Sequence, residues 1–181
     1  MMKIQVSLVL SVALVCLVLG ACAESGKHRS TGQVVDDTSI ATRTKTALLA
    51  DPTTDGLNID VEVDRDKVQL NGFVDSQAQV DKAGEIARSI SGVSSVTNNL
   101  KVSDGTRQTG EYIDDKVLSA NVKAALADDK LAPASEIDVE VNRGVVSLGG
   151  YVDSNAQRDA AVAAAKGVKG VQKVINNLMV R

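Results

Sequence analysis

Residues 58–102 read NIDVEVDRDKVQLNGFVDSQAQVDKAGEIARSISGVSSVTNNLKV, and residues 136–180 read EIDVEVNRGVVSLGGYVDSNAQRDAAVAAAKGVKGVQKVINNLMV. The two stretches align without a gap at a displacement of 78 residues, and about half of their positions are identical. Such self-similarity indicates one structural unit that occurs twice. Upstream, residues 44–51 match residues 121–128 with a displacement one residue shorter, which predicts one extra residue in the loop that follows this segment in the second copy.

The periodicity of apolar residues changes in a fixed order along each copy. Residues 38–50 and 113–127 have apolar side chains at helical spacing, which predicts a first helix. Residues 59–64 and 68–71 then alternate between apolar and polar, as do their counterparts, which predicts two strands with one buried face each. The turns at 64–66 and 142–144 make each strand pair a hairpin.

The rest of each copy predicts a second helix and a third strand. Ser76 and Ser154 can cap the helix, and we expect it to bury apolar positions on one side. These positions are Val80, Ala83, Ala87 and Ile90 in the first copy and Ala161, Ala165 and Val168 in the second. Gly92 and Gly170 would supply a left-handed stop, before third strands at 96–100 and 174–178.

The order α-β-β-α-β, found twice, predicts an α+β protein with two tandem domains. In each, two helices would cover one face of a three-stranded mixed sheet and leave the other face in water. The domains would span 36–102 and 112–181, with a linker at 103–111. Gly72 and Gly150 follow the second strand, where they predict a bulge or a close backbone approach. Packing of the copies on each other would add to cores built mainly from Ala and Val.

The first 35 residues predict export and membrane anchoring. Residues 1–21 contain Lys3 and an apolar run at 4–19 that is too short to cross a bilayer, as in a signal peptide. Leu-Gly-Ala-Cys at 19–22 resembles a bacterial lipobox, so we expect Cys22 to carry a diacylglycerol and an N-acyl chain such as palmitate. Residues 22–35 would then be a flexible tether. Ordinary cleavage after Ala23, which would release a soluble periplasmic protein, is the alternative.

Composition excludes several classes of function. The net charge is −3, which argues against a nucleic-acid ligand. The single His28 and both cysteines precede residue 29, so no His- or Cys-based catalytic or zinc site lies in the repeats. Acidic residues do occupy the polar face of the predicted strands, at Asp60, Glu62, Asp138 and Glu140. We interpret them as solvated charges, and we expect no catalytic residue, metal or other cofactor.

Three motifs in both copies resemble the BON domain. They are V-x-L-x-G-x-V at 68–74 and 146–152, Asp-Ser-x-Ala-Gln at 75–79 and 153–157, and Gly-Val-x-x-Val followed by Asn-Asn-Leu at 92–100 and 170–178. The resemblance implies a non-enzymatic envelope protein that associates with phospholipid and maintains the envelope under osmotic or other stress. Family members with two tandem copies include a soluble periplasmic protein and an outer-membrane lipoprotein. Because Ala23 follows the Cys, the likeness to lipoproteins points to the periplasmic face of the outer membrane.

The family also implies where lipid would bind. In the outer-membrane lipoprotein of the family that has two copies, the first helix of the second domain meets anionic lipid, and that helix carries Lys116, Val117 and Lys123 here. Lys130 continues the seven-residue spacing of the lysines. The second copy also repels an anionic surface less, since its acidic residues exceed its basic ones by a smaller margin. The alternative is a soluble periplasmic module that binds envelope proteins or acts like a chaperone. The sequence leaves the oligomeric state open.

Overall fold

The computed structural model describes residues 31–103 and 109–181. The predicted signal peptide, Cys22, His28 and most of the tether lie outside the described residues. So does part of the predicted linker. The described residues belong to one compact unit, Thr31–Arg181.

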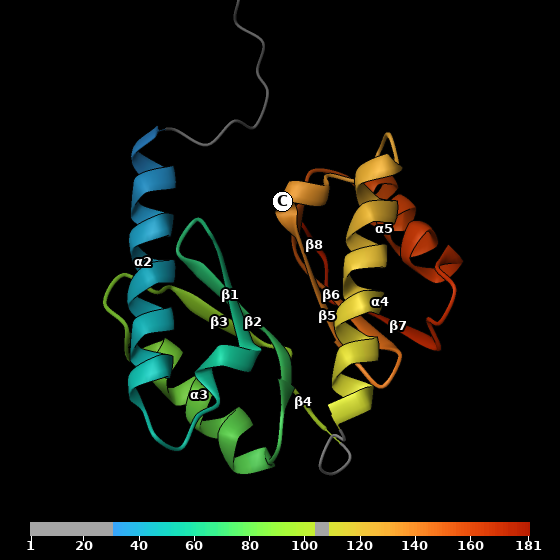
Figure 1. The fold of residues 1–181 in the computed structure, drawn as a ribbon. Coiled ribbons are helices and arrows are strands. Elements are labelled where there is room, and N and C mark those ends of the chain that lie inside the picture. Colours follow the sequence, from blue (N-terminus) through green and yellow to red (C-terminus); the bar gives the residue numbers. More distant parts are fainter. Residues whose placement is uncertain (1–30, 104–108) are drawn as a thin grey trace, which may run out of the picture. The chain divides into compact units, whose positions relative to one another are not determined.

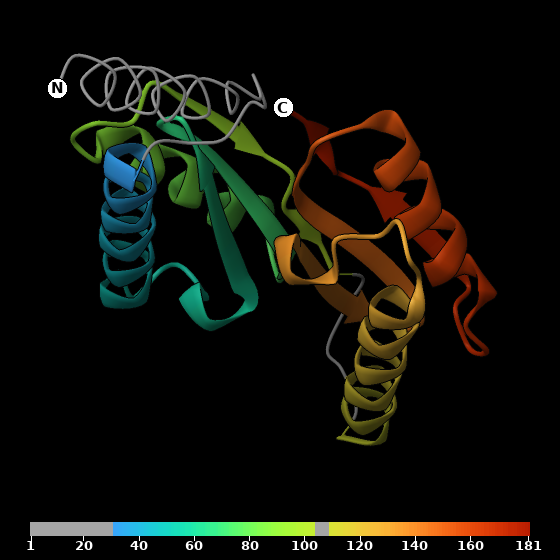
Figure 2. The same ribbon diagram turned by 90° about the horizontal axis from the view of Figure 1, so that it is seen from above.

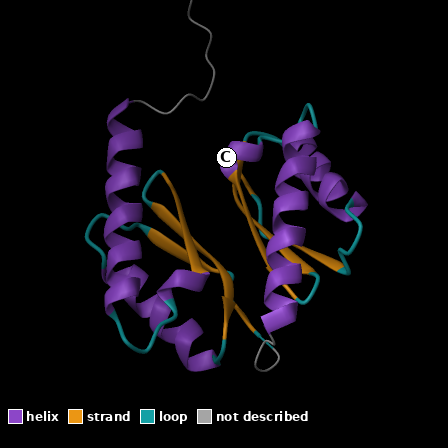
Figure 3. Ribbon diagram, in the orientation of Figure 1, coloured by secondary structure: helices purple, strands orange, loops and turns teal. Residues whose placement is uncertain are grey.

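Each copy has the predicted order of helices and strands (Figures 1 and 3). The first copy consists of α2 (Thr31–Ala50), β1 (Ile59–Asp64), β2 (Lys67–Val74), α3 (Gln77–Ser89), β3 (Ser95–Asn98) and β4 (Lys101–Val102). The second consists of α4 (Thr109–Asp128), β5 (Ile137–Asn142), β6 (Val145–Val152), α5 (Asn155–Gly167), β7 (Lys173–Asn176) and β8 (Met179–Val180). A short 3₁₀ turn precedes β1 and β5, at Gly56–Asn58 and Ala134–Glu136. The α+β class and the two tandem domains are confirmed.

Both sheets are mixed, with the second strand in the centre. β1 pairs antiparallel with β2, whereas β3 and β4 both pair parallel with β2, and the second copy repeats this topology. The sheets therefore have four strands, because the predicted third strand is split in two. The split lies at an Asx turn, in which the side chain of Asn98 accepts a hydrogen bond of 3.2 Å from the N–H of Leu100.

The glycine of the second strand lies next to this split and allows a close backbone approach, as predicted. Gly72 has a φ of 131°, and a Cβ atom there would lie 2.1 Å from the carbonyl oxygen of Asn58. Gly150 has a φ of 112° and the equivalent approach to the carbonyl oxygen of Glu136. A side chain at either position would both strain the backbone and collide with it.

The first helices are longer than predicted. α2 starts within the predicted tether, and α4 starts within the predicted linker. Their buried residues correspond at a constant displacement of 78: Asp37 and Asp115, Ile40 and Leu118, Thr44 and Val122, Leu48 and Leu126. The prediction of an extra loop residue in the second copy is therefore wrong. The Ala-rich sequences at the ends of the two helices are similar enough to align one position out of register.

A buried carboxylate connects each first helix to the hairpin of the same copy. Asp37 accepts hydrogen bonds from the N–H groups of Arg65 and Asp66, at 3.1 and 3.0 Å. Asp115 does the same for Arg143 and Gly144, at 2.8 and 3.1 Å. These turn residues have positive φ, which is the geometry of the tight hairpin turn expected from the sequence.

The second helices begin as predicted and end slightly earlier. The hydroxyl of Ser76 accepts a hydrogen bond from the N–H of Gln79, and the side chain of Gln79 accepts one from the N–H of Asp75, just before the cap. α3 ends at Ser89, because Ile90 is already extended. Gly92 therefore does not stop the helix directly. It has a φ of 93° in the turn that follows, and Gly170 has a φ of 101° in the equivalent turn after α5.

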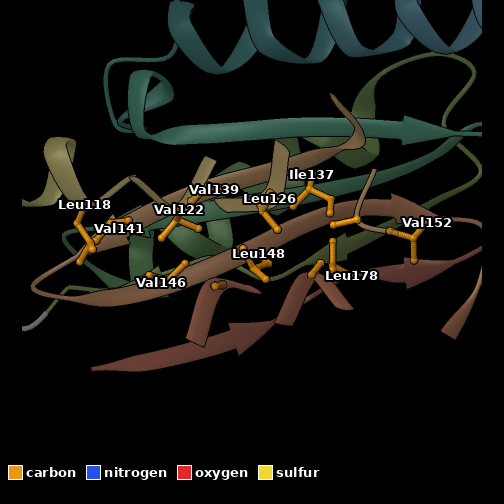
Figure 4. Close-up of a cluster of buried hydrophobic side chains, with 13 residues drawn as sticks. Leu118, Val122, Leu126, Ile137, Val139, Val141, Val146, Leu148, Val152 and Leu178 are labelled. Carbon is orange, nitrogen blue, oxygen red and sulfur yellow. The ribbon is translucent and has the colours of Figure 1, made fainter. Parts of the chain in front are cut away.

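Each copy has its own apolar core between its two helices and one face of its sheet (Figure 2). In the second copy, Leu118, Val122 and Leu126 from α4 meet apolar side chains of β5 and β6 (Figure 4). Ala161 and Ala165 of α5 are fully buried in the same cluster, as are Ala83 and Ala87 of α3 in the first copy. The small alanines let the second helix approach the sheet closely.

Candidate functional sites

The sheet faces that do not carry helices are buried, not solvated. The prediction of a wet second face is wrong, because polar residues of this face in both copies are shielded from solvent. Gln69 is 0% exposed, Asn71 1% and Ser147 2%. β2 contacts β5 and β6, and β1 contacts β6, so these faces pack on each other. We call this contact the inter-copy junction.

Side chains of one copy bind the backbone of the other at this junction. The side-chain amide of Gln69 donates to the carbonyl oxygen of Asn177 and accepts from the N–H of Gly150 at 3.0 Å. The hydroxyl of Tyr151 donates to the carbonyl oxygen of Lys67 at 3.0 Å. Burial, followed by the nearby carboxylates, raises the pKa of Tyr151 to about 12. The junction is therefore polar and specifically hydrogen-bonded.

Arg181 forms a second set of contacts at the junction. Its guanidinium lies 3.5 Å from the carboxylate of Asp64 in the first copy, and both side chains are at least nine-tenths buried. It also donates to Asp153 at 2.9 Å and to Glu136, both in its own copy. One cation thus connects carboxylates of the two copies.

The four acidic strand residues form a cluster at the junction. Asp60, Glu62, Asp138 and Glu140 are all half-buried, which corrects the prediction of freely solvated charges. Asp138 interacts with Glu62 across the junction, and Glu140 interacts with Asp60. Burial raises the pKa of Asp138, and burial together with the charge of Asp60 raises the pKa of Glu140 to about 7. We call these four residues the carboxyl cluster.

The lysines predicted to meet lipid do not form one patch with Val117. Lys116 and Lys123 lie on the side of α4 that faces the carboxyl cluster, since both lower the pKa of Glu140 through their charge. Lys130 lies beyond the helix, which ends at Asp128. The side chain of Asp129 accepts from the N–H groups of Leu131 and Ala132 there and turns the chain away.

Val117 instead lies at a pocket of the second copy that the sequence did not reveal. The pocket has a volume of about 440 Å³ and lies between the start of α4, the β5–β6 turn and the loop before β7. Val117 is 56% exposed, and Arg143 and Lys169 supply positive charge to the lining. Asp114 and Asp115 line it as well, and Asp115 is buried against the hairpin turn. The pocket combines an apolar side chain with charges of both signs.

The described residues contain neither a candidate metal site nor a candidate membrane span. Within residues 31–103 and 109–181, no group of three or more His, Cys, Asp or Glu side chains could hold a metal ion. None of the helices described for these ranges has the length and apolar character needed to cross a membrane.

Sequence reasoning missed the residues that join the copies. Gln69, Asn71 and Tyr151 are polar or aromatic positions on the supposedly wet face, where nothing in the local pattern separates a solvated side chain from one in an interface. Arg181 follows the last strand, and no pattern in the sequence pointed to its role at the junction. A weak signal did exist. A long amide or aromatic side chain at a central strand position has a large surface that burial would remove from water, and a small core favours packing of one copy on the other.

Both copies match one family of known proteins. The BON domain family model matches residues 36–104 and 114–181. The chain is 38% identical over 148 residues to osmotically-inducible protein Y of Escherichia coli, covering 81% of this chain and 74% of that protein. It is 30% identical to outer membrane lipoprotein DolP of Haemophilus influenzae, covering 89% and 85%, and 30% identical to a 21 kDa hemolysin of Actinobacillus pleuropneumoniae, covering 81% and 75%.

The family matches coincide with the two structural copies, and each match includes both helices and all strands of its copy except the first turns of α2 and α4. The paired α-β-β-α-β topology and the sequence matches lead to the same conclusion: the chain belongs to the BON domain family, with two tandem BON domains.

Proposed function

We propose that the chain is a non-enzymatic lipoprotein of the bacterial envelope, whose BON domains associate with phospholipid membranes and help to maintain envelope integrity under osmotic or other stress. Relatives named osmotically-inducible protein Y and outer membrane lipoprotein DolP support the stress and envelope parts of this proposal. The absence of His and Cys from both domains supports a binding role over catalysis.

The proposed anchor is the lipid on Cys22 at the end of the signal peptide. Each buried CH₂ of an acyl chain contributes about 0.8 kcal/mol, so several chains on one residue hold a protein at a membrane durably. The proposed location is the periplasmic face of the outer membrane. Mass spectrometry of the mature protein tests the anchor: we expect an N-terminal Cys22 bearing a diacylglycerol and an N-acyl chain, and an unmodified N-terminus at Glu24 would contradict it.

The proposed second contact lies in the second domain and rests on one observation, the exposed Val117 at the rim of the pocket with Arg143 and Lys169. An apolar side chain can enter the interfacial region while the neighbouring cations meet phosphate. Lys116, Lys123 and Lys130 are exposed and add positive charge to the same domain. A lysine near an anionic surface contributes about 1 kcal/mol, so this contact alone is weak. The anchor compensates, because it keeps the domain at a high local concentration near the bilayer.

Vesicle flotation of a Cys22→Ala variant tests this contact without the acyl chains. We expect binding to vesicles that contain phosphatidylglycerol and weaker binding to pure phosphatidylcholine. Val117→Asp should reduce binding to the anionic vesicles severalfold. The matched control is Ser39→Asp, since Ser39 is exposed and occupies the same position in the first copy, 78 residues earlier. Equal losses in both variants, or equal binding to both lipids, would contradict the assignment to the second domain.

A second candidate is a soluble periplasmic module that binds envelope proteins or unfolded chains. An exposed apolar pair in the first copy favours it: Leu49 is 50% exposed at the end of α2, and Leu57 is 80% exposed in the turn that packs against this end. If Leu57→Asp abolishes envelope protection in cells while Val117→Asp leaves it intact, protein binding replaces lipid binding as the function.

A further inference from the structure

The carboxyl cluster brings acidic groups of both copies into one half-buried place. Asp60 and Glu62 come from β1, and Asp138 and Glu140 come from β5. Two of the contacts cross the junction, Asp138 with Glu62 and Glu140 with Asp60. Two carboxyl groups in contact cannot both ionise without repulsion, so such a pair tends to hold one proton.

Positive charge near the cluster offsets this repulsion only in part. Lys45 of α2 acts on Asp138, and its amine already donates to the carbonyl oxygen of Ile59. Lys123 of α4 acts on both Asp138 and Glu140, and Lys116 acts on Glu140. These two lysines are exposed, so water screens their charge. Four half-buried acidic groups thus face three lysines, of which Lys45 is half-buried and the other two are exposed.

A second, independent observation is that the hydrogen bonding around the cluster is incomplete. Among the described residues, Nδ2 of Asn71 and Oδ2 of Asp138 are buried atoms without a hydrogen-bond partner. Asn71 is 1% exposed and is the cross-strand neighbour of Asp60. Its amide packs against Gly149, which is the cross-strand neighbour of Asp138. Because Oδ2 of Asp138 is buried and accepts no hydrogen bond, the ionised carboxylate is disfavoured. The carboxyl cluster therefore favours binding of a proton.

We propose that the carboxyl cluster makes the inter-copy junction sensitive to pH: protons shared by the acidic pairs hold the two BON domains together, and loss of these protons loosens the junction. The open sheet faces, which the two copies hide from solvent in the joined state, then become accessible. The device depends on residues contributed by both copies, so neither domain has it alone.

The direction of the effect follows from the raised pKa of Glu140. Its ordinary value is 4.5, and at the junction it is about 7. Below about 4.5 the carboxyl is protonated whether or not the copies are joined, so the junction has its full stability. As the pH rises from 4.5 to 7, separated copies release the proton more readily than joined ones. The junction therefore weakens across this window and is weakest above pH 7.

Hydrogen exchange of the full chain, purified in detergent micelles, tests the proposal. The reporter is the amide of Gly150, which donates across the junction to Gln69. Its protection factor, which is the intrinsic exchange rate at each pH divided by the observed rate, should be at least about tenfold lower at pH 8 than at pH 5. The amide of Val122 in the core of the second copy should change much less, because the domain itself stays folded.

Three variants make the test specific. Glu140→Gln is neutral at every pH and should reduce the change at Gly150 to less than about threefold. Asp60→Asn removes the partner of Glu140 on the other copy and should also flatten the pH dependence of protection at Gly150. With two such variants, the test remains possible if one of them misfolds. Glu85→Gln is the matched control, since Glu85 is exposed on α3 and should keep the wild-type profile.

Clear outcomes would overturn the proposal. Protection of Gly150 that does not change with pH would do so, and so would an unchanged profile in both Glu140→Gln and Asp60→Asn. Parallel loss of protection at Val122 would mean global unfolding. No membrane is involved in this readout beyond the micelle, so failure here is distinct from failure of the proposed lipid binding.

Discussion

The side-chain oxygen of Gln69 accepts a hydrogen bond of 3.0 Å from the backbone N–H of Gly150, 81 residues further along the chain. The same amide donates to the carbonyl oxygen of Asn177, so one fully buried side chain satisfies backbone groups in two strand regions of the other copy. Because the N–H of Gly150 is buried at this place, the side chain of Gln69 is needed to satisfy it when the two copies pack.

Gln69→Ala should therefore destabilise the junction strongly. It would leave the buried N–H of Gly150 without a partner, at a cost of about 1–3 kcal/mol, and it would remove the hydrogen bond to the partly buried carbonyl of Asn177, at about 0.5–1.5 kcal/mol. We expect the free energy of unfolding to fall by about 2–4 kcal/mol in urea titrations. Gln77→Ala is the control, because Gln77 bonds Asp81 on the exposed side of α3, and it should change stability by less than about 0.5 kcal/mol. Equal effects of the two substitutions would contradict the role of Gln69.

Two glycines of the second copy provide a test of close packing at the junction. A Cβ atom at Gly149 would lie 2.2 Å from the amide nitrogen of Asn71, whereas a Cβ at Gly167 would have no atom within 4 Å. Gly149→Ala should destabilise by about 1–3 kcal/mol, because the buried amide has little room to move. Gly167→Ala should be neutral or stabilise by up to about 1 kcal/mol. Thermal unfolding of both variants would show this difference, and a neutral Gly149→Ala would mean that the two faces are not tightly packed.

The interior of each domain could be predicted from the sequence, because local patterns determine it. Alternation at 59–64 places Ile59 and Val63 on the buried face, and the hairpin turns and the Ser76 cap are decided by residues close in sequence. Each prediction depended on sterics or hydrogen bonds within a few residues, which a single sequence displays directly.

The small cores led us to expect that the copies pack on each other, but the faces that meet could not be predicted, because period-two alternation identifies two faces of a strand without saying what covers each of them. Glu62 and Glu140 look like ordinary solubilising charges in the sequence. Their burial depends on a contact between residues about 80 positions apart, and no local pattern encodes it. The same ambiguity affected Val117 and Lys116, since adjacent helix residues face different surroundings.

Tyr151 should titrate unusually late. Its hydroxyl donates to Lys67 across the junction, and its pKa of about 12 exceeds the ordinary value of 10. Absorbance titration of a Tyr112→Phe variant isolates this residue, because the chain has only two tyrosines. Gln69→Ala in the same background should bring the titration back toward 10, since opening the junction exposes the phenol to water. A late titration that persists in that double variant would assign the shift to the second domain itself.

Arg181 should contribute more to stability than an arginine that makes an equally short contact to an exposed carboxylate. Its side chain is 10% exposed and joins Asp64 of the first copy, which is 5% exposed, to Asp153 of the second. Arg158 also contacts a carboxylate at 2.9 Å, but that partner, Asp159, is 69% exposed. Removal of one partner from a buried ion pair costs about 3–5 kcal/mol, whereas an exposed pair contributes about 0–1 kcal/mol.

We therefore expect Arg181→Ala to lower the free energy of unfolding by at least about 2 kcal/mol, with little dependence on salt, because buried charges are screened weakly. Arg158→Ala should change it by less than about 0.5 kcal/mol. Arg181→Lys separates charge from shape: the amine keeps the positive charge but cannot reach Asp64, Asp153 and Glu136 together as the guanidinium does. Its stability should fall between the wild type and Arg181→Ala. If Arg181→Lys matches the wild type in urea titrations, charge alone is sufficient at this position, and the three-way contact is not needed to join the copies.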